Sequence, residues 1–518
     1  MSDTKIKEHV VHIDDLESAD MGLDDVMLPE KGQMFTNEEN RDTVIAMAGS
    51  VDSGKSSLTG VLTSGELDDG NGSARMTVAK HPHEKKDGRT SDVSTRVVHH
   101  PDGSRSVLVD LCGHKKYLKT TIFGITGYFP DYGIVMVSAS KGILSMTKEH
   151  LVILTMLKVP IIIVVTKVDI APPKKYKRTL SQIKKFLSHP QIAKKPIFIN
   201  NEKELHGTDG EEMSKLIDIS RQKITKSVTM IHKSLDWVPV ISISNKTGYY
   251  IDEIRTMMHG LKPRPRTIRP STPTGSIFYI NSVFQPPGVG LVVSGTLIGA
   301  DMPVGSTVHI GPFNKTFHKG KIWSIHNDNK ESVDVLRNGE EGCFAFRIAD
   351  KKVELKRNQI KKGKVMVNDL TLAENTCLEF RARVAILHHQ SSIGTRYTPV
   401  IHCGTICQSA RVTVPKVESK DEEGNRVMVE RRLKTGDSAE IIFRFVSHPE
   451  VVNVGMQIFF REGRTRGFGE VTSIKPISED PDPPARSGRR HYFRRYRNRK
   501  TAGRGRRVVK GGKPIKVI

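Results

Sequence analysis

Cysteine is scarce in this sequence, with five residues among 518. So few thiols do not make a disulfide framework, and we expect reduced cysteines in a cytoplasmic protein. Long apolar runs are also lacking. The stretch Ile161 to Val165 is among the longest, far below the ~20 residues that span a bilayer. The first residues are acidic and contain no apolar h-region, so we expect no signal peptide.

Acidic residues are absent from residues 486–518, which hold 14 lysines and arginines. Residues 1–40 show the opposite bias, with 11 acidic and 3 basic side chains, a net charge of −8. The whole chain carries +24, so the residues between these two ends carry +18. This surplus favours an anionic partner, either nucleic acid or a membrane surface.

Arginines alternate with aromatic residues in the basic tail. Aromatic rings can stack on bases while guanidinium groups bind phosphates, so the pattern predicts contact with RNA. The alternative is a tail that serves solubility or localisation. The RNA-contact candidates are Arg489, Arg490, Tyr492, Phe493, Arg494, Arg495 and Tyr496.

The hydrophobic pattern changes along the chain. From Thr43 to Leu261 short β-branched runs alternate with helical patterns, which favours an α/β domain with a mostly parallel sheet. Residues 273–476 contain many short alternating strands between Gly, Pro and Asn turns, which is typical of β-barrels. The fold class expected is therefore α/β plus all-β. The predicted parts are an acidic disordered head (1–40), the α/β domain (41–262), a proline-rich linker (263–272), two barrels (273–362 and 363–476) and a basic disordered tail (477–518).

A phosphate-binding motif follows the first predicted strand. Residues 49–56 read G-S-V-D-S-G-K-S, which fits G-x-x-x-x-G-K-[ST] between a strand and a helix. Backbone N–H groups of such a loop wrap phosphates, and the helix N-terminus favours their negative charge. Lys55 is expected to reach the β- and γ-phosphates and Ser56 to ligate Mg²⁺. The nucleotide-binding candidates here are Gly49, Val51, Asp52, Ser53, Gly54, Lys55, Ser56 and Ser57.

A second motif, Asp110-Leu-Cys-Gly-His114, ends a predicted hairpin strand. Asp110 is placed to hold Mg²⁺ through water, and Gly113 to offer its N–H to the γ-phosphate. Residues 64–95 are expected to form a mobile loop. A hydroxyl within this loop would complete the Mg²⁺ shell; we choose Thr90 and keep Ser91 open, with an inert surface loop as the alternative.

Two further motifs follow buried strands and indicate guanine recognition. Asp169 can accept hydrogens from the N1–H and the amine of guanine, a donor pair that adenine lacks. A strand-end turn or helix cap is the alternative role of this residue. Lys167 is expected to pack along the base, and the loop at residues 244–246 to offer an N–H to the guanine O6. The candidates are Thr166, Lys167, Asp169, Ser244, Asn245 and Lys246.

In this order the motifs resemble those of the translational GTPases of the elongation factor Tu and elongation factor 1-alpha superfamily. The resemblance continues in the predicted barrels, where Val283–Thr296 is similar to a second-domain signature and Phe460–Gly469 to the end of the third domain. The Asp-Leu-x-Gly-His and Thr-Lys-x-Asp motifs and Val400–Gly404 are similar to the GTP-binding protein 1 and 2 group.

The resemblance implies an enzyme that hydrolyses GTP to GDP and phosphate, with Mg²⁺ as its metal. It implies a translation factor that acts with the ribosome and tRNA or another RNA through a nucleotide-dependent switch, as a monomer and away from membranes. Lys55 and His114 fall on the catalytic positions, where His114 positions the attacking water and ribosomal RNA sets its orientation. Thr90 or Ser91 falls on the switch-one magnesium position. Thr166 replaces the usual Asn, so we expect weaker bonds to the guanine N7 or to the P-loop.

Two other functions remain open from the sequence. The arginine–aromatic tail suits a GTP-gated RNA-binding adaptor in ribosome rescue or RNA turnover. A GTPase subunit of sulfate activation shares the expected three-domain plan, although the basic tail argues against it.

Overall fold

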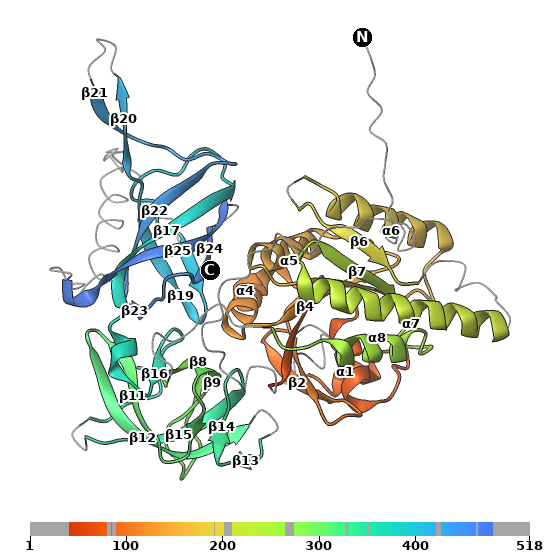
Figure 1. The fold of residues 1–518 in the computed structure, drawn as a ribbon, viewed down its shortest axis with the longest axis horizontal. Helices are drawn as coiled ribbons and strands as arrows, with labels where there is room; N and C mark the ends of the chain where they lie inside the picture. Colours follow the sequence, from red (N-terminus) through yellow and green to blue (C-terminus); the bar gives the residue numbers. More distant parts are fainter. Residues whose placement is uncertain are drawn as a thin grey trace, which may run out of the picture.

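The computed structural model describes residues 41–79, 84, 90–190, 192–200, 210–264, 274–327, 330–350, 353–420, 426–462 and 465–479. The predicted acidic head, most of the linker and the tail from residue 480 onward, with every RNA-contact candidate, lie outside them. The described chain forms an α/β domain and two β-barrels, which confirms the predicted fold class (Figure 1). None of the described helices has the length and apolar character to cross a membrane.

A seven-stranded sheet is the centre of the α/β domain. Its strand order is β2-β3-β1-β4-β5-β7-β6, and the pairings are parallel apart from the β2–β3 hairpin. Because parallel strands are buried on both faces, β1 and β5 are continuous apolar runs without polar alternation. The strands are β1 (Thr43–Gly49), β2 (Ser94–His99), β3 (Arg105–Asp110), β4 (Tyr132–Ser138), β5 (Ile161–Thr166), β6 (Lys195–Phe198) and β7 (Trp237–Ser242).

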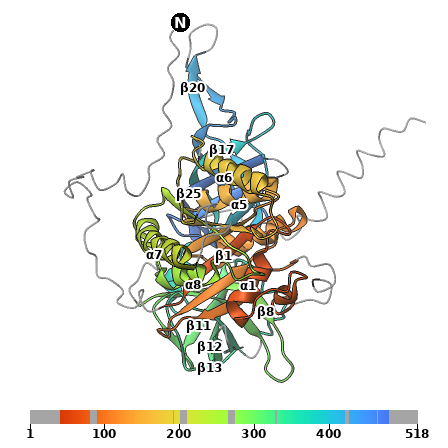
Figure 2. The same cartoon turned by 90° about the vertical axis from the view of Figure 1, so that its right-hand side faces the viewer.

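Helices cover both faces of this sheet (Figures 1 and 2). Ile45 and Met47 of β1 face a core shared with α1, α7 and α8, while Ala46 and Ala48 face a core shared with α4, α5 and α6. The alternation follows from the two-residue period of a strand. The helices are α1 (Lys55–Ser64), α2 (Ser73–Met76), α4 (Leu118–Gly127), α5 (Ser145–Met156), α6 (Pro173–Leu187), α7 (Gly210–Lys233) and α8 (Ile251–Gly260), with a short 3₁₀ turn η3 (Lys115–Tyr117).

The first barrel has strand order β11-β16-β8-β9-β15-β12-β13, and the β11–β12 pairing closes it. Its strand β16 (Val365–Val367) pairs with β8 and β11, so this barrel extends beyond the division predicted after residue 362. Three residues give too short a pattern to be predicted as a strand. The other strands are β8 (Ser276–Phe284), β9 (Val292–Gly299), β11 (Thr307–Phe313), β12 (Thr316–Asn327), β13 (Ser332–Val333) and β15 (Glu341–Ile348), with a separate pair β10 (Met302–Pro303) and β14 (Val335–Leu336).

The second barrel follows after the 3₁₀ turn η5 (Leu370–Ala373) and has strand order β22-β19-β18-β24-β25-β17-β23, closed by β17–β22. A hairpin of β20 (Lys416–Lys420) and β21 (Arg426–Glu430) projects from it, at the top of Figure 2. The barrel strands are β17 (Thr376–His388), β18 (Val400–Cys403), β19 (Ile406–Thr413), β22 (Ser438–Phe445), β23 (Glu450–Val451), β24 (Gln457–Glu462) and β25 (Thr465–Pro476), and the turn η6 (Ile477–Glu479) ends the described chain.

The α/β domain contacts both barrels. Arg466 of β25 forms an ion pair with Glu149 of α5 at 2.6 Å, and Phe459 of β24 joins a core of the α/β domain. The ring of Phe129 lies 5.2 Å from that of Tyr279 in the first barrel. Helix α4 therefore lies between the sheet and the second barrel, a position that links the two (Figure 1).

Candidate active site

The loop between β1 and α1, the P-loop, is shaped by two glycines with positive φ. Gly49 has φ 136° and Gly54, which caps α1, has φ 86°, angles that other residues rarely adopt. The Ser53 hydroxyl donates to the Ser50 carbonyl at 2.8 Å and tightens the turn. The first turn of α1 thereby presents its unpaired N–H groups and positive dipole end to the loop, which favours an anion.

Lys55 lies at the start of α1 with its ammonium group buried. Its Nζ donates to the Ser50 carbonyl at 2.9 Å. Burial lowers the pKa of Lys55, and the charge of Asp110 opposes this effect. A Cβ on Gly113 would lie 2.6 Å from Nζ and 2.8 Å from the backbone N of Val51. The close approach of Gly113 brings the second motif directly against the P-loop.

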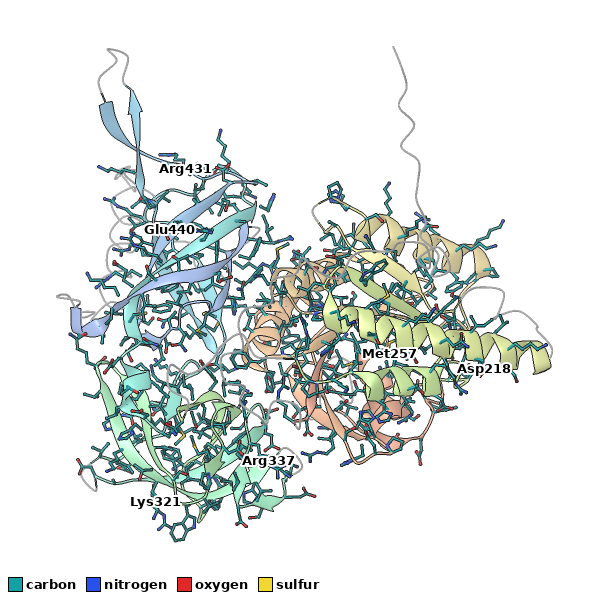
Figure 3. All side chains as sticks on the ribbon, viewed as in Figure 1. Asp218, Met257, Lys321, Arg337, Arg431 and Glu440 are labelled. Carbon is teal, nitrogen blue, oxygen red and sulfur yellow. The ribbon has the colours of Figure 1, made fainter. Side chains whose placement is uncertain are left out.

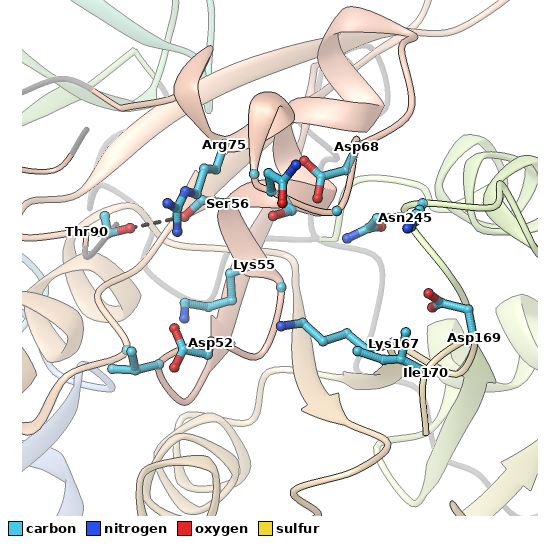
Figure 4. A pocket seen from close by; sticks show the side chains of 18 of the residues that line it. Asp52, Lys55, Ser56, Asp68, Arg75, Thr90, Lys167, Asp169, Ile170 and Asn245 are labelled. Atoms are coloured by element: carbon cyan, nitrogen blue, oxygen red, sulfur yellow. Dashed lines mark hydrogen bonds between the residues drawn. The ribbon is translucent and has the colours of Figure 1, made fainter. Parts of the chain in front are cut away.

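Three predicted magnesium residues meet beside Lys55. The Ser56 hydroxyl donates to Oδ2 of Asp110 at 2.7 Å. It also lies 3.0 Å from Oγ1 of Thr90, as the dashed line in Figure 4 shows. Oδ1 of Asp110 is buried without a hydrogen-bond partner among the described residues, and burial raises the pKa of this carboxyl against the effect of Lys55. Hydroxyl and carboxylate oxygens around an unsatisfied acceptor suit a hard cation such as Mg²⁺.

Ser91 lies in a different environment from Thr90. Its N–H and hydroxyl both donate to Oε1 of Glu84, at 2.7 and 2.8 Å. Of the two hydroxyls left open by the sequence, only that of Thr90 hydrogen-bonds Ser56 in the described structure.

His114 caps the turn η3 and lines the same cavity as Lys55. Its Nδ1 accepts a hydrogen bond from the backbone N–H of Lys116 at 3.1 Å. In the neutral ring the proton is therefore on Nε2, which is a donor in this orientation. The ring packs at a tilt beside Tyr117.

Two loops form the end of the cavity opposite the magnesium residues. Lys167, with φ 61°, and the exposed Asp169 follow β5. Ser244 is buried, and its hydroxyl accepts the N–H groups of Lys246 and Thr247 at 3.3 and 3.1 Å, which holds the second loop in shape. Both loops follow the carboxyl ends of neighbouring parallel strands, the usual ligand-binding edge of such a sheet.

Thr166 behaves differently from the expectation of a weak bond to the P-loop. It is fully buried, and its hydroxyl donates to the Ser53 carbonyl at 2.8 Å. The short side chain of Thr166 reaches the P-loop because β5 ends directly beneath it. A Cβ on Gly54 would lie 3.5 Å from Thr166.

These groups surround one cavity of ≈ 250 Å³ (Figure 4). Gly49, Ser53, Asp110, Thr166 and Ser244 are candidates that support the cavity without lining it. The candidates that line it are Val51, Asp52, Gly54, Lys55, Ser56, Ser57, Thr90, Gly113, His114, Lys167, Asp169, Asn245 and Lys246.

The sequence did not predict several cavity residues. They come mainly from the segment after α1, expected to be a mobile loop, part of which forms α2. The only sequence signal was the turn pattern Asp-Asp-Gly-Asn-Gly. His150 of α5 was also not predicted: its Nδ1 accepts the N–H of Gly49 at 2.9 Å, and burial lowers its pKa to about 3. The unpredicted lining residues are Asp68, Gly70, Asn71, Gly72, Arg75 and Ile170.

Comparison with known proteins agrees with this geometry. Residues 40–264 match the family model described as the elongation factor Tu GTP binding domain. The chain is 24% identical over 426 residues to elongation factor 1-alpha of Methanothrix thermoacetophila, covering 77% of this chain and 89% of that protein. The translation elongation factor SelB of Methanococcus maripaludis shares the fold, with a TM-score of 0.58, 20% identity and coverage of 85% of this chain and 80% of that chain. The family match and the motifs around one cavity define residues 40–264 as a GTPase domain of the elongation factor Tu type.

Within this class the similarity to one group is higher. The chain is 34% identical over 455 residues to GTP-binding protein 1 of Xenopus laevis, covering 83% of this chain and 63% of that protein. It is 32% identical over 465 residues to GTP-binding protein 2 of Mus musculus, covering 85% and 71%. The chain belongs to the GTP-binding protein 1 and 2 family of translational GTPases, and it spans about two thirds of the length of these relatives.

Proposed function

We propose that this GTPase is a translation factor that works with the ribosome and with tRNA or another RNA, and that GTP hydrolysis changes its conformation. The observation that carries the proposal is the meeting of phosphate, magnesium and guanine residues around one cavity, in a domain packed against two barrels. The cytoplasm and a monomeric state are expected for such a factor.

The phosphate chain of GTP is bound by the P-loop amides and by Lys55, a contact that the buried position of its ammonium group supports. Ser56, Thr90 and, through water, Asp110 would hold Mg²⁺, and the bound ion would neutralise charge on the phosphates. Asp169 selects guanine, with Lys167 packed along the base and the loop at residues 244–246 facing its O6.

His114 orients the attacking water and does not take its proton in this orientation. Nδ1 is occupied by the Lys116 N–H, so the ring offers Nε2–H to the water oxygen. A donor of this kind fixes the position of the nucleophile, and it depends on the ring being turned toward the phosphate. We infer that ribosomal RNA supplies this orientation and that hydrolysis without the ribosome is slow.

The switch is supported by the location of the nucleotide-sensing residues. Gly113 touches the P-loop, and the chain runs from it through η3 into α4, which packs on β18 of the second barrel. A shift of Gly113 between GTP and GDP is thereby transmitted to the barrel contact. Glu149 and Arg466 link the same two domains through α5.

An RNA partner is supported by charge and by one surface of the first barrel. Trp323 of β12 is 63% exposed, and the guanidinium carbon of Arg347 lies 4.3 Å from its ring centroid. Lys319 and Lys321 are exposed on the same strand, and Figure 3 labels Lys321. A ring that stacks on bases beside groups that bind phosphate suits RNA. The tail candidates remain a prediction.

The adaptor function, in ribosome rescue or RNA turnover, is the second candidate, because the arginine–aromatic tail is a separate potential RNA contact. The two candidates differ in what deletion of residues 486–518 does. Loss of RNA binding without loss of ribosome-stimulated turnover favours the adaptor. The sulfate-activation alternative draws no support from the relatives reported above, whose names describe elongation factors and GTP-binding proteins.

The test is GTP turnover by purified protein with and without ribosomes. We expect ribosomes to stimulate the wild type. We expect His114→Ala to lower the stimulated rate about a hundredfold, because misplacing the attacking water slows the reaction on that scale, with GTP affinity unchanged. His388→Ala, an exposed histidine of the second barrel, is the matched control. Wild-type turnover that ribosomes leave unchanged would contradict the proposal.

A further inference from the structure

The segment after α1 is held in one conformation by two neighbouring aspartates. Oδ1 of Asp69 accepts the N–H groups of Asn71, Gly72 and Ser73 at 2.7, 2.9 and 3.1 Å. Oδ1 of Asp68 accepts the N–H of Ala74 at 3.0 Å. The carboxylates thus satisfy the free amides at the start of α2 and place this single helical turn over the cavity.

This segment is attached to the loop that we assign to the base. The N–H of Asp68 donates to the Asn245 carbonyl at 2.9 Å. Gly70 lies against the side chain of Lys246, whose Cδ would be 3.2 Å from a Cβ at that position. One end of the segment is therefore joined to the guanine loop, and α2 extends from there toward the P-loop helix.

Arg75 is the residue of α2 that reaches the phosphate end of the cavity. Its side chain packs on Gly72, where a Cβ would lie 2.6 Å from the arginine Nε. Gly72 has φ 96° and no side chain, so the guanidinium group can extend past it. Arg75 lines the cavity together with Ser56 and Thr90, as Figure 4 shows.

The guanidinium group of Arg75 lacks protein partners in the part of the chain that the structure describes. Its Nε is buried without a hydrogen bond there, and no described acid forms an ion pair with it. A partly buried cation beside a cavity, with its fork of donors unused, is positioned for an anionic ligand. The ligand expected at this end of the cavity is the phosphate chain of a nucleotide.

We infer that Arg75 is a phosphate-binding residue that the segment after α1 supplies from within the chain. This inference rests on the proposed nucleotide site. The side chain of Arg75 lines the cavity beside Ser56, which lies in the first turn of α1. It therefore contacts phosphate oxygens in the ground state of both GDP and GTP. Because the N–H of Asp68 is hydrogen-bonded to the Asn245 carbonyl, a base bound at that loop also holds Arg75 in place.

The test is the equilibrium dissociation constant of the full chain for GDP and for a non-hydrolysable GTP analogue, both with Mg²⁺. We expect Arg75→Ala to raise both constants about tenfold or more, the scale of one charge-assisted hydrogen bond. Arg75→Lys should recover part of the loss, because it retains the charge without the fork. Arg383→Ala, an exposed arginine on β17, should leave both constants unchanged.

A second background separates phosphate contact from base contact. Asp169→Asn should change the preference of the site from GDP to xanthosine diphosphate, because the Asn amide donates a hydrogen bond to the xanthine carbonyl. In that background Arg75→Ala should weaken xanthosine diphosphate by the same factor as it weakens GDP in the wild type. If Arg75→Ala binds GDP as the wild type does, while Asp169→Asn still changes the base preference, the role of Arg75 is wrong and the nucleotide site stands. A loss confined to turnover would overturn it too, and failure of both variants to affect nucleotide binding would overturn the site itself.

Discussion

The two ends of the nucleotide cavity are built in different ways. At the phosphate end the groups are buried and attached to the sheet: Lys55 is 6% exposed and Asp110 1%. At the base end Asp169 is exposed and Ile170 is 67% exposed, both on a loop. A buried charge is costly unless it has a partner of opposite charge. The buried groups at the phosphate end therefore favour a charged ligand. In the proposed site we expect the base end to decide which nucleotide binds and the phosphate end to decide whether any nucleotide binds.

The largest expected effect comes from Lys55→Ala. Removing the buried ammonium group leaves the phosphates and Asp110 without their cation, and nucleotide affinity should fall about a hundredfold or more, since pairing at a buried charge is worth several kcal/mol. Titration with a fluorescent GDP analogue measures this loss. Lys174→Ala, an exposed lysine of α6 that does not line the cavity, is the control. Normal GDP binding by Lys55→Ala would contradict the view that the phosphate end decides whether a nucleotide binds.

The next effect comes from the base end. Asp169→Asn should weaken GDP about a hundredfold, because hydrogen bonds to the guanine N1–H and amine are lost, while xanthosine diphosphate gains affinity. The protein still binds a nucleotide, which is the contrast with Lys55→Ala. Competition between the two diphosphates measures the exchange. A parallel loss for every nucleotide would mean that Asp169 stabilises the fold of the loop.

A smaller effect tests the buried support of the P-loop. Thr166→Val keeps the shape of the side chain and removes its bond to the Ser53 carbonyl, leaving that buried acceptor unpaired. We expect a loss of about 1–3 kcal/mol in the free energy of unfolding. Urea denaturation measures it, with Thr225→Val on the exposed face of α7 as the control. Equal stability of the two variants would show that the bond contributes little.

The last effect is a dependence of stability on pH. His150 is buried and neutral, with a pKa lowered to about 3, whereas an unfolded histidine titrates near about 6.5. Between these values the unfolded chain binds the extra proton, so stability is full above about pH 6.5 and falls as the pH drops toward 3. His150→Gln keeps an acceptor for the Gly49 N–H and does not titrate. The variant should show a shallower loss of unfolding free energy from pH 6.5 to 4.5 than the wild type and the exposed His326→Gln. Parallel pH profiles would contradict a buried neutral His150.

The same contrast explains what the sequence could predict. The P-loop, Asp110–His114 and Thr166–Asp169 each depend on a strand end and a local turn, and a few consecutive residues carry that information. Arg75 and His150 depend on contacts that tertiary structure creates, such as the Gly49–His150 bond across 101 residues. Strand β16 was missed for the same reason, because its place in the first barrel comes from pairing with β8 and β11. Thr90 and Ser91 are adjacent, so only the fold separates them.

The most direct measurement is competition of GTP and ATP against a labelled guanine nucleotide on the full chain. Asp169 has a donor pair to recognise on guanine and none on adenine, and a site built for hydrogen bonds rejects a ligand that lacks them. GTP should therefore displace the label at concentrations near its dissociation constant, while ATP fails to do so at about a hundredfold excess. Displacement by ATP at the same concentrations as GTP would contradict a guanine-specific site.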